Sequence, residues 1–139
     1  MFKLGIVGSS KADKSAYEQI KLYIDMNTSI YTGTSDTVVV SGGEPNGVDS
    51  IVRDACKHLG VGFKEFKPEK IGWEYFKKRN LQIAEYCDKI ISFALPYGTT
   101  AGVPKCYHCT NAGKDDNHEK TAGCYTGKAC GEYEVIIIK

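Results

Sequence analysis

Residues 38–50 read Val-Val-Val-Ser-Gly-Gly-Glu-Pro-Asn-Gly-Val-Asp-Ser, and this stretch decides the fold. A β-branched run, typical of a buried strand, gives way to a glycine-rich turn. Apolar residues then recur at helical spacing from Val48 to Leu59, and Gly60 follows as a stop signal. The stretch therefore predicts a strand, a turn and a helix. Such a turn suits an anion such as phosphate, because glycines let a ligand approach the main chain and the helix begins with unpaired N–H groups.

The same succession recurs along the chain. Residues 3–7 predict a strand that ends in the turn Gly8-Ser9-Ser10, and residues 14–26 predict the helix after it. Further strands are predicted at 62–66, 89–94 and 133–138, and further helices at 73–86 and 121–129. Strands that alternate with helices imply right-handed crossovers and a parallel sheet between helix layers. We therefore expect one α/β domain over residues 1–139, a three-layer sandwich with a mainly parallel five-stranded sheet.

Composition restricts the classes of partner. The chain has 18 Lys and Arg against 17 Asp and Glu, a balance that does not favour nucleic acid as a partner. The basic residues between Lys64 and Arg79 alternate with glutamates, as on an ordinary solvated surface. The amino-terminal residues show no signal-peptide pattern, and no apolar run is long enough to span a membrane. These features predict a cytoplasmic protein.

Two of the predicted turns should meet at one place. The carboxyl ends of parallel strands lie at the same edge of a sheet, so Gly8-Ser9-Ser10 and the loop from Ser41 to Gly47 can converge on a single crevice. Asp49 falls in the first helical turn after that loop. Its carboxylate would either complement the helix dipole or accept a hydrogen bond from a ribose hydroxyl.

Arg79 and Asn80 form a second polar feature, inside the helix predicted at residues 73–86. Asn80 shares a face with apolar residues, and a buried amide needs hydrogen-bond partners. Two interpretations remain open. Asn80 either ties down a neighbouring loop, or it orients the glycine loop while Arg79 reaches a phosphate of the ligand.

The insertion at about residues 96–120 is the only long stretch without periodicity, so something other than an apolar core must order it. Cys106, Cys109, His118 and Cys124 follow the spacing C-x2-C-x8-H-x5-C, which predicts a tetrahedral zinc site. His108 can replace one of the cysteines, and Cys130 can replace His118. Four protein ligands leave no open position, so we expect the Zn²⁺ to be structural.

With these motifs in view, the chain resembles the SLOG superfamily over nearly its whole length. This Rossmann-like group includes the DNA-processing protein DprA and the Lonely Guy families. The resemblance rests on Gly5-Ile6-Val7-Gly8-Ser9, on Ser41-Gly42-Gly43 with Gly47-Val48-Asp49, and on Arg79-Asn80. The family's Gly-Thr element after the fourth strand is matched by Gly98-Thr99 or by Thr121-Ala122-Gly123. The resemblance implies a pocket for a nucleotide or a nucleotide-derived molecule.

The chain departs from the enzymes of this superfamily. Lonely Guy phosphoribohydrolases carry Pro-Gly-Gly-x-Gly-Thr with a catalytic Glu three residues on, whereas residues 96–100 read Pro-Tyr-Gly-Thr-Thr. No complete catalytic motif is present, so the sequence leaves open whether the protein is an enzyme.

The leading hypothesis is therefore a module that binds a nucleotide or a nucleotide-derived ligand. An alternative is a phosphoribohydrolase acting on nucleoside monophosphates, with Asp49 or Glu44 as a substitute acid. A third hypothesis is single-stranded nucleic-acid binding on the surface from Lys64 to Arg79. Proteins with related folds often form dimers, so a homodimer is a further hypothesis. The candidate ligand-binding residues are Gly8, Ser9, Ser10, Ser41, Gly42, Gly43, Gly47, Asp49, Arg79, Asn80 and Gly123.

Overall fold

The structure is a computed structural model that describes residues 1–28 and 36–139. Five strands form one sheet in the order β3-β2-β1-β4-β5, and each neighbouring pair is parallel. The strands are β1 (Phe2–Gly8), β2 (Thr37–Ser41), β3 (Phe63–Glu65), β4 (Lys89–Ala94) and β5 (Tyr133–Ile137). The helices are α1 (Tyr17–Thr28), α2 (Val48–Leu59), α3 (Trp73–Tyr86), α4 (Tyr107–Asn111) and α5 (Ala122–Cys130), with a 3-10 turn at Lys14–Ala16 before α1. The predicted α/β fold with a parallel sheet is confirmed.

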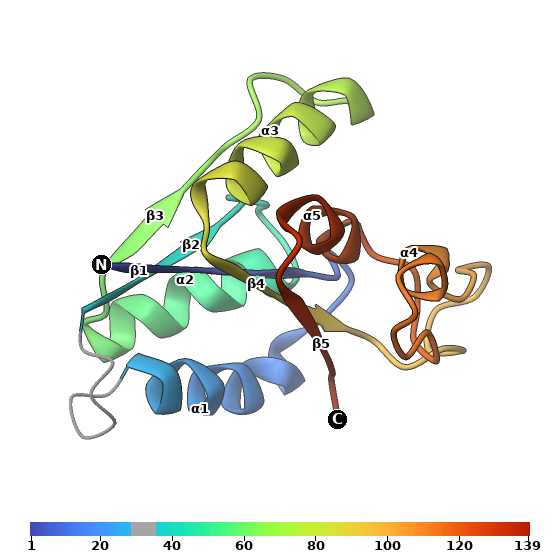
Figure 1. The fold of residues 1–139 in the computed structure, drawn as a ribbon. Coiled ribbons are helices and arrows are strands. Elements are labelled where there is room, and N and C mark those ends of the chain that lie inside the picture. Colours follow the sequence, from blue (N-terminus) through green and yellow to red (C-terminus); the bar gives the residue numbers. More distant parts are fainter. Residues whose placement is uncertain (29–35) are drawn as a thin grey trace.

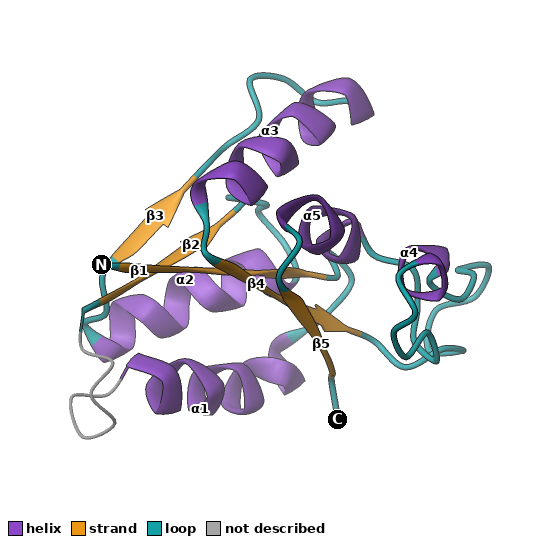
Figure 2. Ribbon diagram, viewed as in Figure 1, coloured by secondary structure: helices purple, strands orange, loops and turns teal. Residues whose placement is uncertain are grey.

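Helices cover both faces of the sheet. Helices α1 and α2 lie on one face, and α3 and α5 lie on the other (Figure 1 and Figure 2). Helix α2 illustrates why the sequence folds this way. Its buried residues Val48, Ile51, Val52 and Ala55 recur at helical spacing, and it ends at Gly60, whose φ of 72° is left-handed.

Each helix layer packs on its own apolar cluster. The cluster under α1 and α2 is mostly aliphatic and includes Ile6, Ile20, Val39 and Val52. The cluster under α3 and α5 combines Val7, Val40 and Ile83 with Cys106, Cys109 and Cys124. The second layer is therefore rich in thiols.

The insertion lies beside α5, beyond the end of β4 (Figure 1). Helix α4, which the sequence did not predict, is only 5 residues long. Two isolated antiparallel bridges hold the end of the insertion in place: His118 pairs with Pro96 at its beginning, and Glu119 pairs with Lys105 in its middle. A five-residue helix is too short to show a periodicity, which explains why the pattern missed it.

The strand order fixes where a ligand crevice can form. β1 is the central strand, and the chain passes from it outward through β2 and β3 before it crosses to β4 on the other side. The carboxyl ends of β1 and β4 are adjacent, with Gly8 paired to Phe93. The point where the strand order reverses is the usual ligand position in such sheets. Within the described residues, no helix combines the length and the apolar character that crossing a membrane requires.

Candidate functional site

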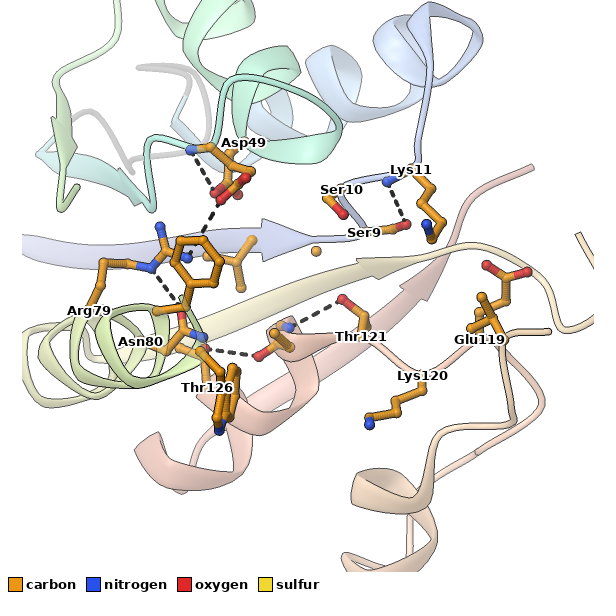
Figure 3. A pocket seen from close by; sticks show the side chains of 18 residues that line it. Ser9, Ser10, Lys11, Asp49, Arg79, Asn80, Glu119, Lys120, Thr121 and Thr126 are labelled. Atoms are coloured by element: carbon orange, nitrogen blue, oxygen red, sulfur yellow. Dashed lines mark hydrogen bonds and ion pairs between the residues drawn. The ribbon is translucent and has the colours of Figure 1, made fainter. Parts of the chain in front are cut away.

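A cleft of about 270 Å³ opens at the carboxyl ends of β1 and β4. Its walls come from the turn after β1, from α3 and from the beginning of α5 (Figure 3). The polar side chains labelled in that view are Ser9, Ser10, Lys11, Asp49, Arg79, Asn80, Glu119, Lys120, Thr121 and Thr126. The structure thus gathers distant parts of the chain at the predicted edge of the sheet.

The two predicted turns are in contact. The N–H of Val48 donates to the carbonyl of Ser9 at 2.9 Å, so α2 begins directly on the turn after β1. A Cβ at Gly47 would lie 2.4 Å from the Cα of Ser10, and the φ of Gly47 is 76°. Only glycine allows this approach. The contact also uses the first N–H of α2, so that donor faces the protein rather than a ligand.

The glycine loop contributes Glu44 to the wall of the cleft, but its small residues lie behind that wall. Ser41, Gly42, Gly43 and Gly47 are not among the residues that line it, whereas Gly8, Ser9, Ser10 and Gly123 are. A Cβ at Gly42 would lie 2.7 Å from a guanidinium nitrogen of Arg79. The loop therefore supports the side chains that form the wall.

Arg79 holds this loop. The residue is 6% exposed. Its Nε donates to Asn80 Oδ1 at 2.8 Å, and another guanidinium nitrogen donates to the carbonyl of Gly42. A third nitrogen lies 3.9 Å from a carboxylate oxygen of Glu44. The contact with the glycine loop, which one interpretation of the sequence gave to Asn80, is made by Arg79.

Asn80 is left with an unused donor. Its side chain is buried, with 4% of the residue exposed, and its Oδ1 is occupied by Arg79. Its Nδ2 has no hydrogen-bond partner in the described part of the chain. An unpaired buried donor costs about 1–3 kcal/mol, so such a group in a cleft wall is ready to donate to a ligand.

Asp49 is buried in the same wall. Its carboxylate accepts from Ser41 Oγ at 3.1 Å and from the N–H of Glu44 at 3.3 Å. Burial raises the pKa of Asp49 to about 6, although Arg79 and these hydrogen bonds act in the opposite direction. The carboxyl therefore titrates close to neutral pH and ties the glycine loop to α2.

The beginning of α5 supplies the opposite wall. Thr121 is the N-cap, and its Oγ1 accepts from the N–H of Gly123 at 3.2 Å. A Cβ at Gly123 would lie 3.0 Å from the Cα of Gly8, so the absence of a side chain lets the helix start against the turn after β1. The helix N-terminus and the lining residues Lys11 and Lys120 bring positive charge to this end of the cleft, where the carboxylate of Glu119 also lies (Figure 3).

Sequence reasoning missed several residues of the cleft. Glu119 is 2% exposed, and its carboxylate accepts from the N–H of Thr100. Trp73, Phe76, Lys11 and Lys120 also line the cleft. The one available signal was Thr121, a typical N-cap residue at the beginning of the helix predicted at 121–129.

The four predicted metal ligands come together. One ligand atom from each of Cys106, Cys109, His118 and Cys124 lies within 4.8 Å of all the others, and the four residues are buried. The two alternatives lie elsewhere. His108 packs against the rings of Tyr107 and Tyr125, and the thiol of Cys130 lies 3.6 Å from the carbonyl of Cys87.

The hydrogen bonds around this cluster fit a metal ion. His118 Nδ1 lies 2.9 Å from the carbonyl of Glu119, which can only accept, so Nδ1 carries the proton. Nε2 then carries a free lone pair, and this atom is buried without a hydrogen-bond partner among residues 1–28 and 36–139. Orientation of a ligating histidine through its other nitrogen is the usual arrangement at metal sites.

The thiols have outer partners as well. Cys124 Sγ lies 3.4 Å from Ser92 Oγ, and Cys109 Sγ lies 3.4 Å from the hydroxyl of Tyr133. Hydrogen bonding from Cys124 lowers the pKa of Cys106 to about 5, whereas hydrogen bonding to Cys106 and burial raise the pKa of Cys124. A divalent cation would let all three thiols ionise. Three thiolates and an imidazole form a donor set that Zn²⁺ favours.

Comparisons with known proteins add information on the fold. No protein-family model matches the chain, and no curated protein matches it. Among solved structures, it is similar to the X-ray structure of TM1055, a structural genomics target, with a TM-score of 0.51 and 22% identity over 68% of this chain. The matched region spans 61% of the length of TM1055. This similarity and the parallel sheet establish a Rossmann-like α/β fold.

Proposed function

We propose that the protein binds a nucleotide or a nucleotide-derived molecule in this cleft. The observation that carries the proposal is the unpaired Nδ2 of Asn80, buried in a cleft at the point where the strand order reverses. A phosphate against the start of α5 would meet the helix N-terminus, Lys11 and Lys120, and Asn80 would donate to a ligand oxygen. The resemblance to the SLOG superfamily supports the same assignment.

The small volume of the cleft limits the ligand to about one nucleotide, and its aromatic residues suit a base. Ligand pockets usually enclose about 300–1,000 Å³, and the cleft of about 270 Å³ lies just below that range. Trp73 and Phe76 line the cleft and offer aromatic faces to a base. Asp49 and Glu119 are available as acceptors for ribose hydroxyls.

We further propose that the cluster of Cys106, Cys109, His118 and Cys124 holds a structural Zn²⁺. His118 and Cys124 flank the cleft residues Glu119, Lys120, Thr121 and Gly123 in the sequence. An ion bound to both ends of this short segment would fix the wall of the cleft between them.

Titration calorimetry with AMP, GMP, CMP, UMP and ribose 5-phosphate tests the ligand. The informative variant is Asn80→Asp, since it keeps the oxygen that accepts from Arg79 and removes the donor. We expect it to weaken binding at least tenfold, because a donor becomes a negative group facing a phosphorylated ligand. Gln82→Glu is the matched control, with the same chemical change at an exposed position of α3. Equal affinities for the two variants, or no binding by the wild type, would contradict the proposal.

A second candidate function is hydrolysis of the N-glycosidic bond of a nucleoside monophosphate. The observation in its favour is that two buried carboxyls, Asp49 and Glu119, line the cleft and that the pKa of Asp49 is about 6. In this reaction water adds across the bond, which releases free base and ribose 5-phosphate. Chromatography of nucleoside monophosphates incubated with the protein decides the question. Release of base that Asp49→Asn or Glu119→Gln abolishes would support an enzyme, and unchanged substrate would contradict it.

No observation favours the third hypothesis, single-stranded nucleic-acid binding on the surface from Lys64 to Arg79. Arg79 is buried and is not part of that surface.

A further inference from the structure

A second pocket adjoins the cleft. It has a volume of about 530 Å³ and is lined by four aromatic rings, those of Trp73, Tyr107, His108 and Tyr125, and by Lys77 and Lys120. We call it the aromatic pocket. Trp73, Lys120 and Ala122 line both the cleft and the aromatic pocket, so the two share a wall.

The rings form an unbroken series. The centroid of Trp73 lies 5.6 Å from that of Tyr125, Tyr125 lies 5.7 Å from His108, and His108 lies 4.4 Å from Tyr107. These residues come from α3, α4 and α5, so folding gathers them from three separate elements. Trp73 is nevertheless 55% exposed and Tyr107 is 49% exposed. Trp73 and Tyr107 therefore keep exposed surface that a planar ligand can reach.

The charge of the aromatic pocket selects among planar ligands. Lys77 and Lys120 line it, and no carboxylate is among its lining residues in the described chain. The ammonium group of Lys120 lies 4.7 Å from the centre of the Tyr107 ring. Aromatic cages also bind organic cations, but two lysines would repel a cation. Aromatic faces next to ammonium groups are instead the combination that binds a base with its phosphate.

We propose that the aromatic pocket is a second base subsite and that the ligand is a dinucleotide. One nucleotide occupies the cleft and the second base stacks in the aromatic pocket. The phosphate that links the two nucleotides lies near Lys120, which borders both sites. The inference rests on the proposed function, since it needs the first nucleotide in the cleft.

Calorimetry with AMP and with the dinucleotide pApA tests the inference. Stacking of one base contributes about 1–3 kcal/mol, so pApA should bind at least fivefold more tightly than AMP. Tyr107→Ala and Lys77→Ala should each reduce this advantage and leave the affinity for AMP unchanged. Lys78→Ala is the matched control, because Lys78 is exposed on the same helix and pairs with Glu69 instead. Because Tyr107 is next to Cys106, the zinc content of Tyr107→Ala is also measured. Its affinities are compared with those of the wild type only for protein with a full equivalent of zinc.

The outcomes separate the two proposals. Failure of both AMP and pApA to bind would overturn the proposed function. Binding of AMP with no gain for pApA would overturn the second subsite alone, and so would a gain that Tyr107→Ala and Lys77→Ala leave intact. Much tighter binding of an eight-nucleotide adenylate strand than of pApA would contradict the dinucleotide and indicate a nucleic-acid strand as the ligand. Equal affinities for pApA and the longer strand would support the dinucleotide.

Discussion

The two faces of the sheet are stabilised in different ways. Beneath α1 and α2, fully buried aliphatic side chains such as Ile20, Ile24 and Val52 fill the layer. Beneath α3 and α5, Cys106, Cys109 and Cys124 lie where aliphatic residues would otherwise pack. The first layer is held by the hydrophobic effect, whereas the second brings three thiols and an imidazole together and would gain stability from the proposed Zn²⁺. The cleft lies against the second layer.

The largest loss of stability should follow from loss of the proposed metal in the thiol-rich layer. Cys124→Ser removes a ligand that belongs to α5 and to the thiol-rich layer. We expect the free energy of unfolding to fall by more than about 4 kcal/mol, because loss of a metal site ranks among the most destabilising changes. Urea unfolding and zinc quantification on the same samples provide the measurement.

The control for this variant is Cys130→Ser, on the same helix but outside the cluster. It should keep a full equivalent of zinc and lose much less stability. Equal zinc contents in the two serine variants would show that the cluster does not bind the ion.

A cavity in the layer under α1 and α2 should lower stability without changing the zinc content. Ile20→Ala opens a cavity in the aliphatic layer and should cost about 2–5 kcal/mol. Zinc content should stay at the wild-type value, because Ile20 belongs to the other cluster. Leu22→Ala, at a position that is 59% exposed on the same helix, should change stability by less than about 0.5 kcal/mol. Zinc loss from the Ile20 variant would mean that the layers are not independent.

The sequence predicted the fold better than the roles of individual side chains. Continuous β-branched runs and helical spacing are strong local signals, so each predicted strand and helix is present in the structure. The spacing of Cys106, Cys109, His118 and Cys124 likewise predicted which residues gather in one cluster. Spacing does not tell which of two adjacent helical residues reaches a loop, so it could not give the loop contact to Arg79 rather than Asn80. Glu119 and Lys120 were missed because they belong to no periodic element.

The titration of Asp49 gives a pH test of the cleft wall, where its carboxyl ties the glycine loop to α2. Its pKa is about 6 in the folded protein and 3.8 in the reference state, so the folded form holds the proton more tightly. Its stabilising contribution is therefore present at low pH and is lost as pH rises from about 4 to about 6. The stability of the wild type relative to Asp49→Asn should fall by up to about 3 kcal/mol from pH 3 to pH 7. Urea unfolding across this range measures it, and a constant difference would contradict the raised pKa.

The smallest expected effect concerns an outer partner of the metal ligands. Tyr133→Phe keeps the ring and removes the hydroxyl that lies 3.4 Å from Cys109 Sγ. Loss of such a partner lowers metal affinity by about 10–100-fold. Competition with a chromophoric chelator measures this affinity. Tyr86→Phe, at a half-buried tyrosine of α3 in the same layer, is the control and should leave it unchanged. Identical affinities for the two phenylalanine variants would remove Tyr133 from the metal site.

The closeness of the four proposed metal ligands along the chain bears on the order of folding in the presence of Zn²⁺. All four lie between Cys106 and Cys124, whereas pairing of β1 with β4 joins Leu4 to Lys89. Closing a short loop costs less chain entropy than closing a long one. Capture of the ion can therefore precede assembly of the sheet, and the carboxyl-terminal part can gather around it while the amino-terminal strands are still free. The concentration of free zinc would then control how fast the protein refolds.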